Sequence, residues 1–427
     1  MSELDEHKLT VEIESTGERI QSGDAIQSYR LESDYLTPAD AFQFTVYNDA
    51  DPASLRRKFR PLMRVKLYID GELQLLGRID SIEGTGNSGS ALLVKGRDYV
   101  AELVDGGADP AVKFTDKMDL GAALLLLWRP FGIRTLVGNF NLTRNLLTGR
   151  IPVVNFTPRD FHEAKLTDFT VRAGDGAFQA GDRLVSRHGF TIQQGGERGT
   201  LCIVEPMYGQ EPLEELVRGE NMMTGRAIRD YGDAPTVTIT TGRVKASEKT
   251  RDATLFGRTA GVGQSAKPTA NQVLPALVQF PTFGELSPNE LGKFDEVKQT
   301  ALEPTSLLRQ ARVDPYASTM PFEPQDDVLY RPLFVEDKDS RTDEQMERVA
   351  RRELSRRVAS CLSYRATMRG HRELKSRAVF TVDTMWTVKD AIEDVNQRMW
   401  VKSRSLYNDG SGPRSDIELI LPGAIAL

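Results

Sequence analysis

The glycine-rich segment from Gly84 to Gly89 has the G-x-G-x-x-G spacing of a dinucleotide-binding loop. Such a loop must open a helix whose N-terminus faces the pyrophosphate. The residues that follow, Ala91 to Val94, instead have the composition of a strand. We therefore predict a hairpin turn at this segment, and we expect no cofactor.

Cysteine and histidine could supply nucleophilic or metal chemistry. Cys202 could act with His188 or His162 as nucleophile and base. It lies, however, in the strand-like segment LCIVE, where a cysteine packs as a small apolar residue. None of the four histidines, which include His7 and His371, lies at metal-ligand spacing from another histidine or a cysteine. We expect no catalytic residue, no metal site and no enzyme activity.

An arginine-rich face is the one charge feature that could bind a partner. Helical spacing over 342–362 puts apolar residues on one stripe and arginines opposite. Two interpretations remain open: a solvated face whose arginines pair with nearby glutamates, or a face that docks an acidic partner or DNA. We favour the first, because this helix lacks the interleaved aromatic residues of a single-strand groove. If it is a contact face, its residues are Arg348, Arg351, Arg352 and Arg356.

Composition narrows the class of protein. With 427 residues, 39% hydrophobic and 27% charged, the chain is predicted to be soluble and globular, with about two to four domains. Its net charge of −6 argues against a dedicated nucleic-acid binder. The longest apolar run, Gly121 to Trp128, is too short to cross a bilayer, and the acidic N-terminal segment does not have the pattern of a secretory signal. Two distant cysteines indicate a reducing compartment without a disulfide framework.

Residues 1–104 have the pattern of an antiparallel β domain. Apolar and polar side chains alternate over 28–36, 42–48 and 64–70, which places one set in a core. Asp70-Gly71 follows the last of these segments and is a strong hairpin signal. Short strands with tight turns favour a small barrel or sandwich, and we predict an N-terminal β-barrel.

Residues 105–220 are predicted to form an α+β domain. A helix over 119–131, with Asp119 as its N-cap, is followed by a second helix over 174–188. Two strands then flank the turn Gly195-Gly196.

A second β-barrel is predicted from 221–245 and 326–427, together with the arginine-rich helix. Between them, 246–325 carries eight prolines, spaced too closely for long helices or central strands, so we predict an irregular insertion. No repeat between the two β units is detectable in the sequence. The expected fold class is α+β and mainly β: two small antiparallel, tube-like barrels, an α+β domain between them, and a long insertion in the second.

This order of elements resembles the baseplate hub family of contractile phage tails, typified by the hub of phage Mu and the late-control proteins. Four parts of the sequence carry the resemblance: 77–105, 175–203, 219–242, and 331–373 with its continuation 386–425. The likeness is one of element order and loose patterning over most of the chain. It fails over 246–325 and at His371, where the family usually has a tryptophan.

The resemblance implies a structural role in the virion tail baseplate, assembled in the bacterial host cytoplasm. Hubs of this family are homotrimers in which each chain contributes two barrels. The resulting six barrels adapt a threefold tail spike protein to the sixfold tail tube or tube-initiator protein. Baseplate wedge proteins would be further partners, DNA would be present only in transit through the channel, and no membrane anchor is expected.

Two other functions remain as alternatives. One is a tail-associated cell-wall hydrolase, which a peptidoglycan clearing assay would detect. The other is an oligonucleotide- or sugar-binding β-barrel module. That function predicts salt-sensitive binding that weakens when Arg351 and Arg352 are replaced.

Overall fold

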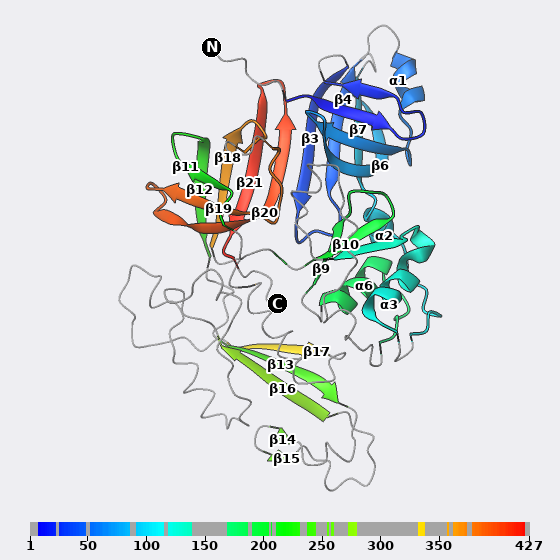
Figure 1. The fold of residues 1–427 in the computed structure, drawn as a ribbon, viewed down its shortest axis with the longest axis vertical. Helices are drawn as coiled ribbons and strands as arrows, with labels where there is room; N and C mark the ends of the chain where they lie inside the picture. Colours follow the sequence, from blue (N-terminus) through cyan, green and yellow to red (C-terminus); the bar gives the residue numbers. More distant parts are fainter. Residues whose placement is uncertain are drawn as a thin grey trace.

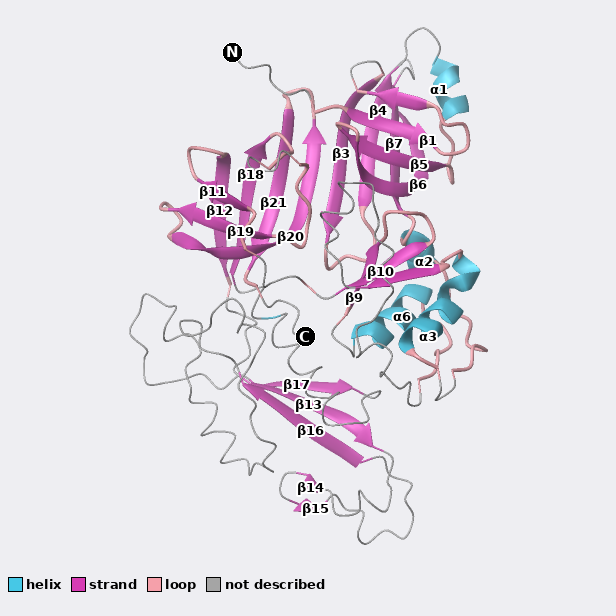
Figure 2. Ribbon diagram, viewed as in Figure 1, coloured by secondary structure: helices cyan, strands magenta, loops and turns pink. Residues whose placement is uncertain are grey.

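The computed structural model describes residues 7–22, 25–47, 52–85, 91–114, 118–138, 169–186, 190–204, 206, 211–230, 237–244, 254–255, 258–259, 272–279, 332–337, 357, 362–373 and 378–422. Figure 1 shows two β units side by side, with β3 and β20 upright and adjacent where the units meet. Figure 2 shows the helices α2, α3 and α6 gathered next to the strands β9 and β10.

The first β unit contains seven strands and the short helix α1 (Pro52–Lys58). The strands are β1 (Leu9–Ile13), β2 (Arg19–Gln21), β3 (Ile26–Asp34), β4 (Ala41–Tyr47), β5 (Arg64–Ile69), β6 (Glu72–Thr85) and β7 (Ala91–Asp98). Asp70 and Gly71 both have positive φ (51° and 85°) and connect β5 to β6, which confirms the predicted tight hairpin. β6 and β7 pair antiparallel, with Thr85 opposite Ala91, so these two strands form the predicted hairpin.

The second β unit contains six strands. They are β11 (Glu214–Val217), β12 (Met222–Arg229), β18 (Leu362–Arg369), β19 (Met385–Asp390), β20 (Val395–Asn408) and β21 (Pro413–Ile420). All of its neighbouring strands pair antiparallel except β11 and β19, which pair parallel.

A ladder between β3 and β20 joins the two units into one 13-stranded sheet. Leu31 lies opposite Leu406 in this ladder, and both are buried in an apolar core that draws side chains from both units. Among the described strands the path runs from β12 to β2 without closing. The prediction of antiparallel β units is confirmed, but neither predicted barrel is closed in the described part of the chain.

The two units repeat one topology. The strand order β3-β4-β7-β6-β5 in the first matches β12-β18-β21-β20-β19 in the second. In each unit one 14-residue strand, β6 or β20, pairs over its first half with the preceding strand and over its second half with the following one. Both have a bulge near the change of partner, between Ile79 and Ser81 and between Val401 and Ser403. The structure thus contains a repeat that the sequence does not reveal.

An α+β module packs beside the first unit around its own apolar core. It contains α2 (Ala101–Asp105), α3 (Leu120–Trp128), the 3-10 turn η1 (Arg129–Phe131), β8 (Thr135–Gly138), α6 (Ala177–Ser186), β9 (Thr191–Gln194) and β10 (Thr200–Val204). The Asp119 side chain accepts a hydrogen bond from the amide of Ala122 at 2.7 Å, as expected for the predicted N-cap. Buried Trp128 donates its indole N–H to the carbonyl of Ala177, which ties α3 to α6.

Within the predicted insertion 246–325 the structure describes three strands that were not predicted: β14 (Thr254–Leu255), β15 (Arg258–Thr259) and β16 (Gln272–Gln279). β16 pairs with β13 (Val237–Val244), which precedes the insertion, and β13 also pairs with β17 (Pro332–Asp337), which follows it, so these three strands form a separate sheet. β14 pairs with β15. β16 tolerates Pro275 because it is an edge strand of this sheet, where a missing N–H need not break a ladder. The proposed domain boundaries stay a prediction.

Residues 378–382 form an irregular segment in which Val379 and Phe380 are buried. Their apolar residues fill the core instead of following a ladder. The predicted helix over 342–362 lies outside the described residues apart from helical Arg357 and Leu362, where β18 begins. No helix in the described part of the chain is long and apolar enough to span a membrane.

Candidate functional site

One continuous polar face crosses the joint between the β units. Residues that lie opposite one another in a ladder share a face of the sheet, so the strand registers define its members. The polar face consists of Thr224, Arg226, Arg365, Thr367, Asp416, Glu418, Ser403, Ser405, Tyr407, Arg30, Glu32 and Asp34. The opposite face of the same strands packs into the apolar core.

Ion pairs connect neighbouring strands across the polar face. Arg365 of β18 pairs with Glu418 of β21 at 3.2 Å. Lys402 of β20 reaches Glu418 at 3.2 Å and Asp34 of β3 at 3.5 Å, which bridges the joint. Ion pairs at the surface each contribute only about 0–1 kcal/mol, and these pairs are partly exposed. Their main consequence is that the arginines and carboxylates of the face neutralise one another.

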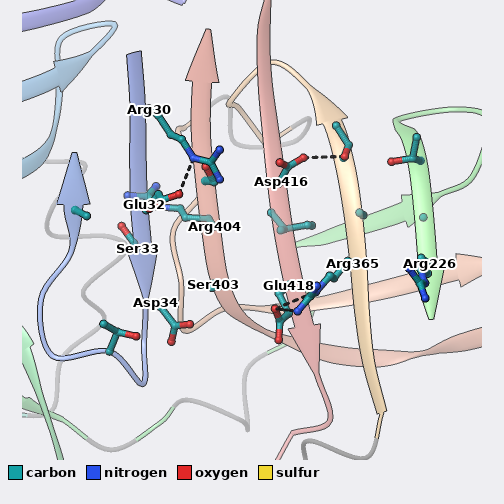
Figure 3. Close-up of a pocket in the computed structure, with 18 of the residues that line it drawn as sticks. Arg30, Glu32, Ser33, Asp34, Arg226, Arg365, Ser403, Arg404, Asp416 and Glu418 are labelled. Atoms are coloured by element: carbon teal, nitrogen blue, oxygen red, sulfur yellow. Dashed lines mark hydrogen bonds and ion pairs between the residues drawn. The ribbon is translucent and has the colours of Figure 1, made fainter. Parts of the chain in front are cut away.

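A hollow of about 580 Å³ lies over this face, lined by six neighbouring strands from β4 to β12 and by the loop between β3 and β4 (Figure 3). Figure 3 shows carboxylates and guanidinium groups along its floor, with Arg365 directed at Glu418. The described residues contain no cluster of histidine, cysteine and carboxylate ligands that could hold a metal. The hollow therefore presents a wall of mixed charge.

Buried charges lie at the joint itself. Arg404 of β20 is only 7% exposed, and its guanidinium donates to the carbonyl of Phe380. Burial lowers the pKa of Arg404 to about 10, although the charge of Asp40 opposes this shift. Burial raises the pKa of Asp40 to about 6, against the opposing effects of a hydrogen bond with Ser33 and the charge of Arg404. Asp98 has its pKa raised by burial and by the charge of Asp40. The charges of Arg404 and Asp40 therefore couple β20 to the first unit.

A histidine cluster forms a second connection between the units. Its members are His7, Tyr29, Asp70, His371, Arg372 and Ser415. The rings of His7 and His371 lie 4.8 Å apart between centroids, and the Tyr29 hydroxyl is 2.9 Å from Nε2 of His371. Ser415 is 2.8 Å from Nδ1 of His371 and donates to the carbonyl of Gly370. Because His371 and Ser415 are both fully buried, no substrate can reach this serine–histidine pair.

Charge in this cluster is set by its surroundings. Burial, followed by the nearby His7, lowers the pKa of His371 to about 3, so its ring is neutral at pH 7. Burial alone would raise the pKa of Asp70, but hydrogen bonds from His7, the Lys8 amide and Arg372 outweigh it and lower the pKa to about 2. Asp70 thus remains an anion that anchors groups from both ends of the chain.

Of the site residues considered in the sequence, the structure describes Cys202 but not the others discussed next. Cys202 is fully buried, and burial raises the pKa of its thiol to about 12, so it is unsuited to be a nucleophile. His162 and His188 lie outside the described residues, as does the predicted arginine face of Arg348, Arg351, Arg352 and Arg356. That face stays a prediction.

The sequence did not predict the features at the joint. His7 and His371 are 364 residues apart, so their spacing in the sequence gives no indication that they are in contact. The polar face was equally hidden, because each strand alternates correctly without indicating its neighbour. The only local signal was the alternation of charged and apolar residues in β3, β20 and β21.

Similarity to known proteins is found at the level of structure. No protein-family model and no curated protein matches the sequence. The 43 kDa tail protein of prophage MuSo2 from Shewanella oneidensis has a TM-score of 0.63 at 16% identity, covering 98% of this chain and 99% of that one. The tail protein from Neisseria meningitidis MC58 has a TM-score of 0.63 at 16% identity, covering 99% of both chains. This chain shares the fold of these two tail proteins.

A third structure agrees. A prophage tail protein from Listeria monocytogenes EGD-e has a TM-score of 0.52 at 10% identity, covering 97% of this chain and 94% of that one. The tail protein fold therefore extends over almost the whole chain at identities too low for sequence comparison to detect.

Proposed function

We propose that this chain is the structural hub of a contractile-tail baseplate and has no enzyme activity. Three copies would form a ring in which each contributes two β units, so that six similar units surround one axis. Such a ring matches a threefold spike at one end and a sixfold tube at the other. In the completed ring each β unit would form one tube-like barrel.

The repeat of strand order within one chain carries this proposal. A chain with two equivalent units, already joined edge to edge by β3 and β20, supplies one third of a sixfold arrangement. The phage tail fold supports the same function. The polar face would line the central channel, where a wall of balanced charge would neither hold nor strongly repel DNA in transit.

Mass in solution tests the proposal. Size-exclusion chromatography with light scattering should give three times the chain mass of 47.6 kDa. A monomer at every concentration would remove the proposal's main requirement. A peptidoglycan clearing assay should be negative, and clearing that is lost on replacing a single acid would favour the hydrolase alternative.

A further inference from the structure

Within one chain, β3 pairs with β20, but the equivalent strands β12 and β6 do not pair with each other. In the repeat, β20 corresponds to β6 and β3 corresponds to β12. Within the described part of the chain, β12 pairs only with β18, and the stretch of β6 from Asp80 to Thr85 pairs only with β7. Each unit therefore has an open edge, β6 in the first and β12 in the second. The repeat predicts a neighbouring strand at each of these edges.

We propose that the open edge of β6 in one copy of this chain pairs antiparallel with β12 of a second copy, in the register of β3 and β20. This inference rests on the proposed function for the number of copies, but the pairing itself follows from the repeat. The partner at both edges is then another copy of this chain.

The register follows from the two bulges. Starting there, successive ladder partners are Ser81, Lys95, Gln43 and Arg30 in the first unit, and Ser403, Glu418, Arg365 and Arg226 in the second. Arg30 and Arg226 are therefore equivalent positions. Because Ser405 lies opposite Glu32 within the chain, Glu83 should lie opposite Ile228 of the second copy.

Charge on the two edges is complementary. The β6 edge carries Asp80 and Glu83, which pair with Arg97 and Lys95 of β7, and no basic residue between Asp80 and Thr85. β12 carries Arg226 and Arg229 and no acidic residue. In the proposed register Glu83 is diagonal to Arg226, a separation that long side chains can bridge. The four exposed residues of β12, including both arginines, also fit a strand that lacks a neighbour.

This association is head to tail, because two different edges meet. A head-to-tail contact either closes into a ring or continues as a filament, according to its rotation. Here the rotation is set by the same geometry that relates the two units inside one chain. Repeating that step through three copies would return to the starting edge and leave no open β6 or β12.

Disulfide trapping tests the pairing. In a Cys361→Ser background, the variant carrying Glu83→Cys and Ile228→Cys should form intermolecular disulfides under mild oxidation, seen as covalent multimers up to trimers on non-reducing gels. Chains with only Glu83→Cys, mixed with chains that have only Ile228→Cys, should give covalent dimers. The residual Cys202 is buried.

Two controls calibrate the result. Glu32→Cys with Ser405→Cys occupies the equivalent rung inside one chain, so it should lose its free thiols without any increase in mass. Glu83→Cys with Arg226→Cys is displaced by two residues along β12, beyond the usual disulfide span, and should cross-link at least tenfold more slowly.

The outcomes separate the two proposals. If the mixed chains give no covalent dimer while the intrachain control closes, the β6–β12 pairing is wrong, even if light scattering finds a trimer. If light scattering finds only a monomer or dimer while the mixed chains cross-link in register, the pairing stands and the trimeric hub fails. Equal cross-linking of the in-register and displaced pairs would also overturn the proposed register.

Discussion

Replacing Gly370 by alanine should disrupt the histidine cluster specifically. Gly370 has φ of +78°, a conformation that costs a residue with a side chain about 1–2 kcal/mol. A Cβ atom there would also lie 2.8 Å from Nε2 of His7 and displace it. Moving His7 breaks its hydrogen bond to Asp70, and bonds to charged groups contribute about 1.5–3 kcal/mol. Gly370→Ala should therefore lower the free energy of unfolding by about 2.5–5 kcal/mol, the sum of these two costs.

Gly219 provides the matched control. Its φ is +87° and no heavy atom lies within 4 Å of the added Cβ, so Gly219→Ala should incur only the backbone cost. Urea unfolding followed by tryptophan fluorescence compares the two variants. In a His7→Ala background, the effect of Gly370→Ala should fall to that of Gly219→Ala. Equal effects of the two glycine substitutions in the native background would refute the assigned contact.

Three further predictions concern packing, pH and thiol chemistry. Gly181→Ala should destabilise the α+β module, because the added methyl overlaps the indole of Trp128. The cost of overpacking, about 1–3 kcal/mol, should outweigh the gain of about 1 kcal/mol from helix propensity. Thermal unfolding shows whether the variant is less stable than the native protein. Asp40 has a raised pKa of about 6 in the folded state, so its contribution to stability falls as pH rises from about 4 to 6. Asp40→Asn should remove that part of the pH dependence of the melting temperature in thermal scans. An unchanged dependence of the melting temperature on pH would contradict the prediction. Cys202, with its thiol pKa near 12, should resist a thiol reagent in a Cys361→Ser variant until the chain unfolds, and rapid labelling of native protein would contradict its burial.

Local features of the fold could be predicted because they depend on a few neighbouring residues. Asp70-Gly71 specifies a turn, and Asp119 caps a helix that begins at the next residue. The pairing of β3 with β20 was out of reach, because alternation shows that a strand has two faces but does not show which strand lies beside it. The strand in the insertion was missed because Pro275 excludes a central strand but permits an edge strand.

The repeat was hidden for a related reason. β6 reads ELQLLGRIDSIEGT and β20 reads VNQRMWVKSRSLYN, two strands of equal length with few shared residues. Their common demands are a buried side on each half and a bulge where the partner changes. Many sequences satisfy such demands, so topology persists after sequence similarity is lost.

The strand β20 has a mechanical consequence. Its first half belongs to the ladder with β19, and its second half lies between β21 and β3. A force that pulls the β19 ladder away from the β21 ladder acts on the covalent backbone of β20 around the bulge at Val401 and Ser403. Separating the two β units instead requires breaking the β3–β20 hydrogen bonds. A pull on the molecule should therefore part the ladder between the units before it divides either unit internally.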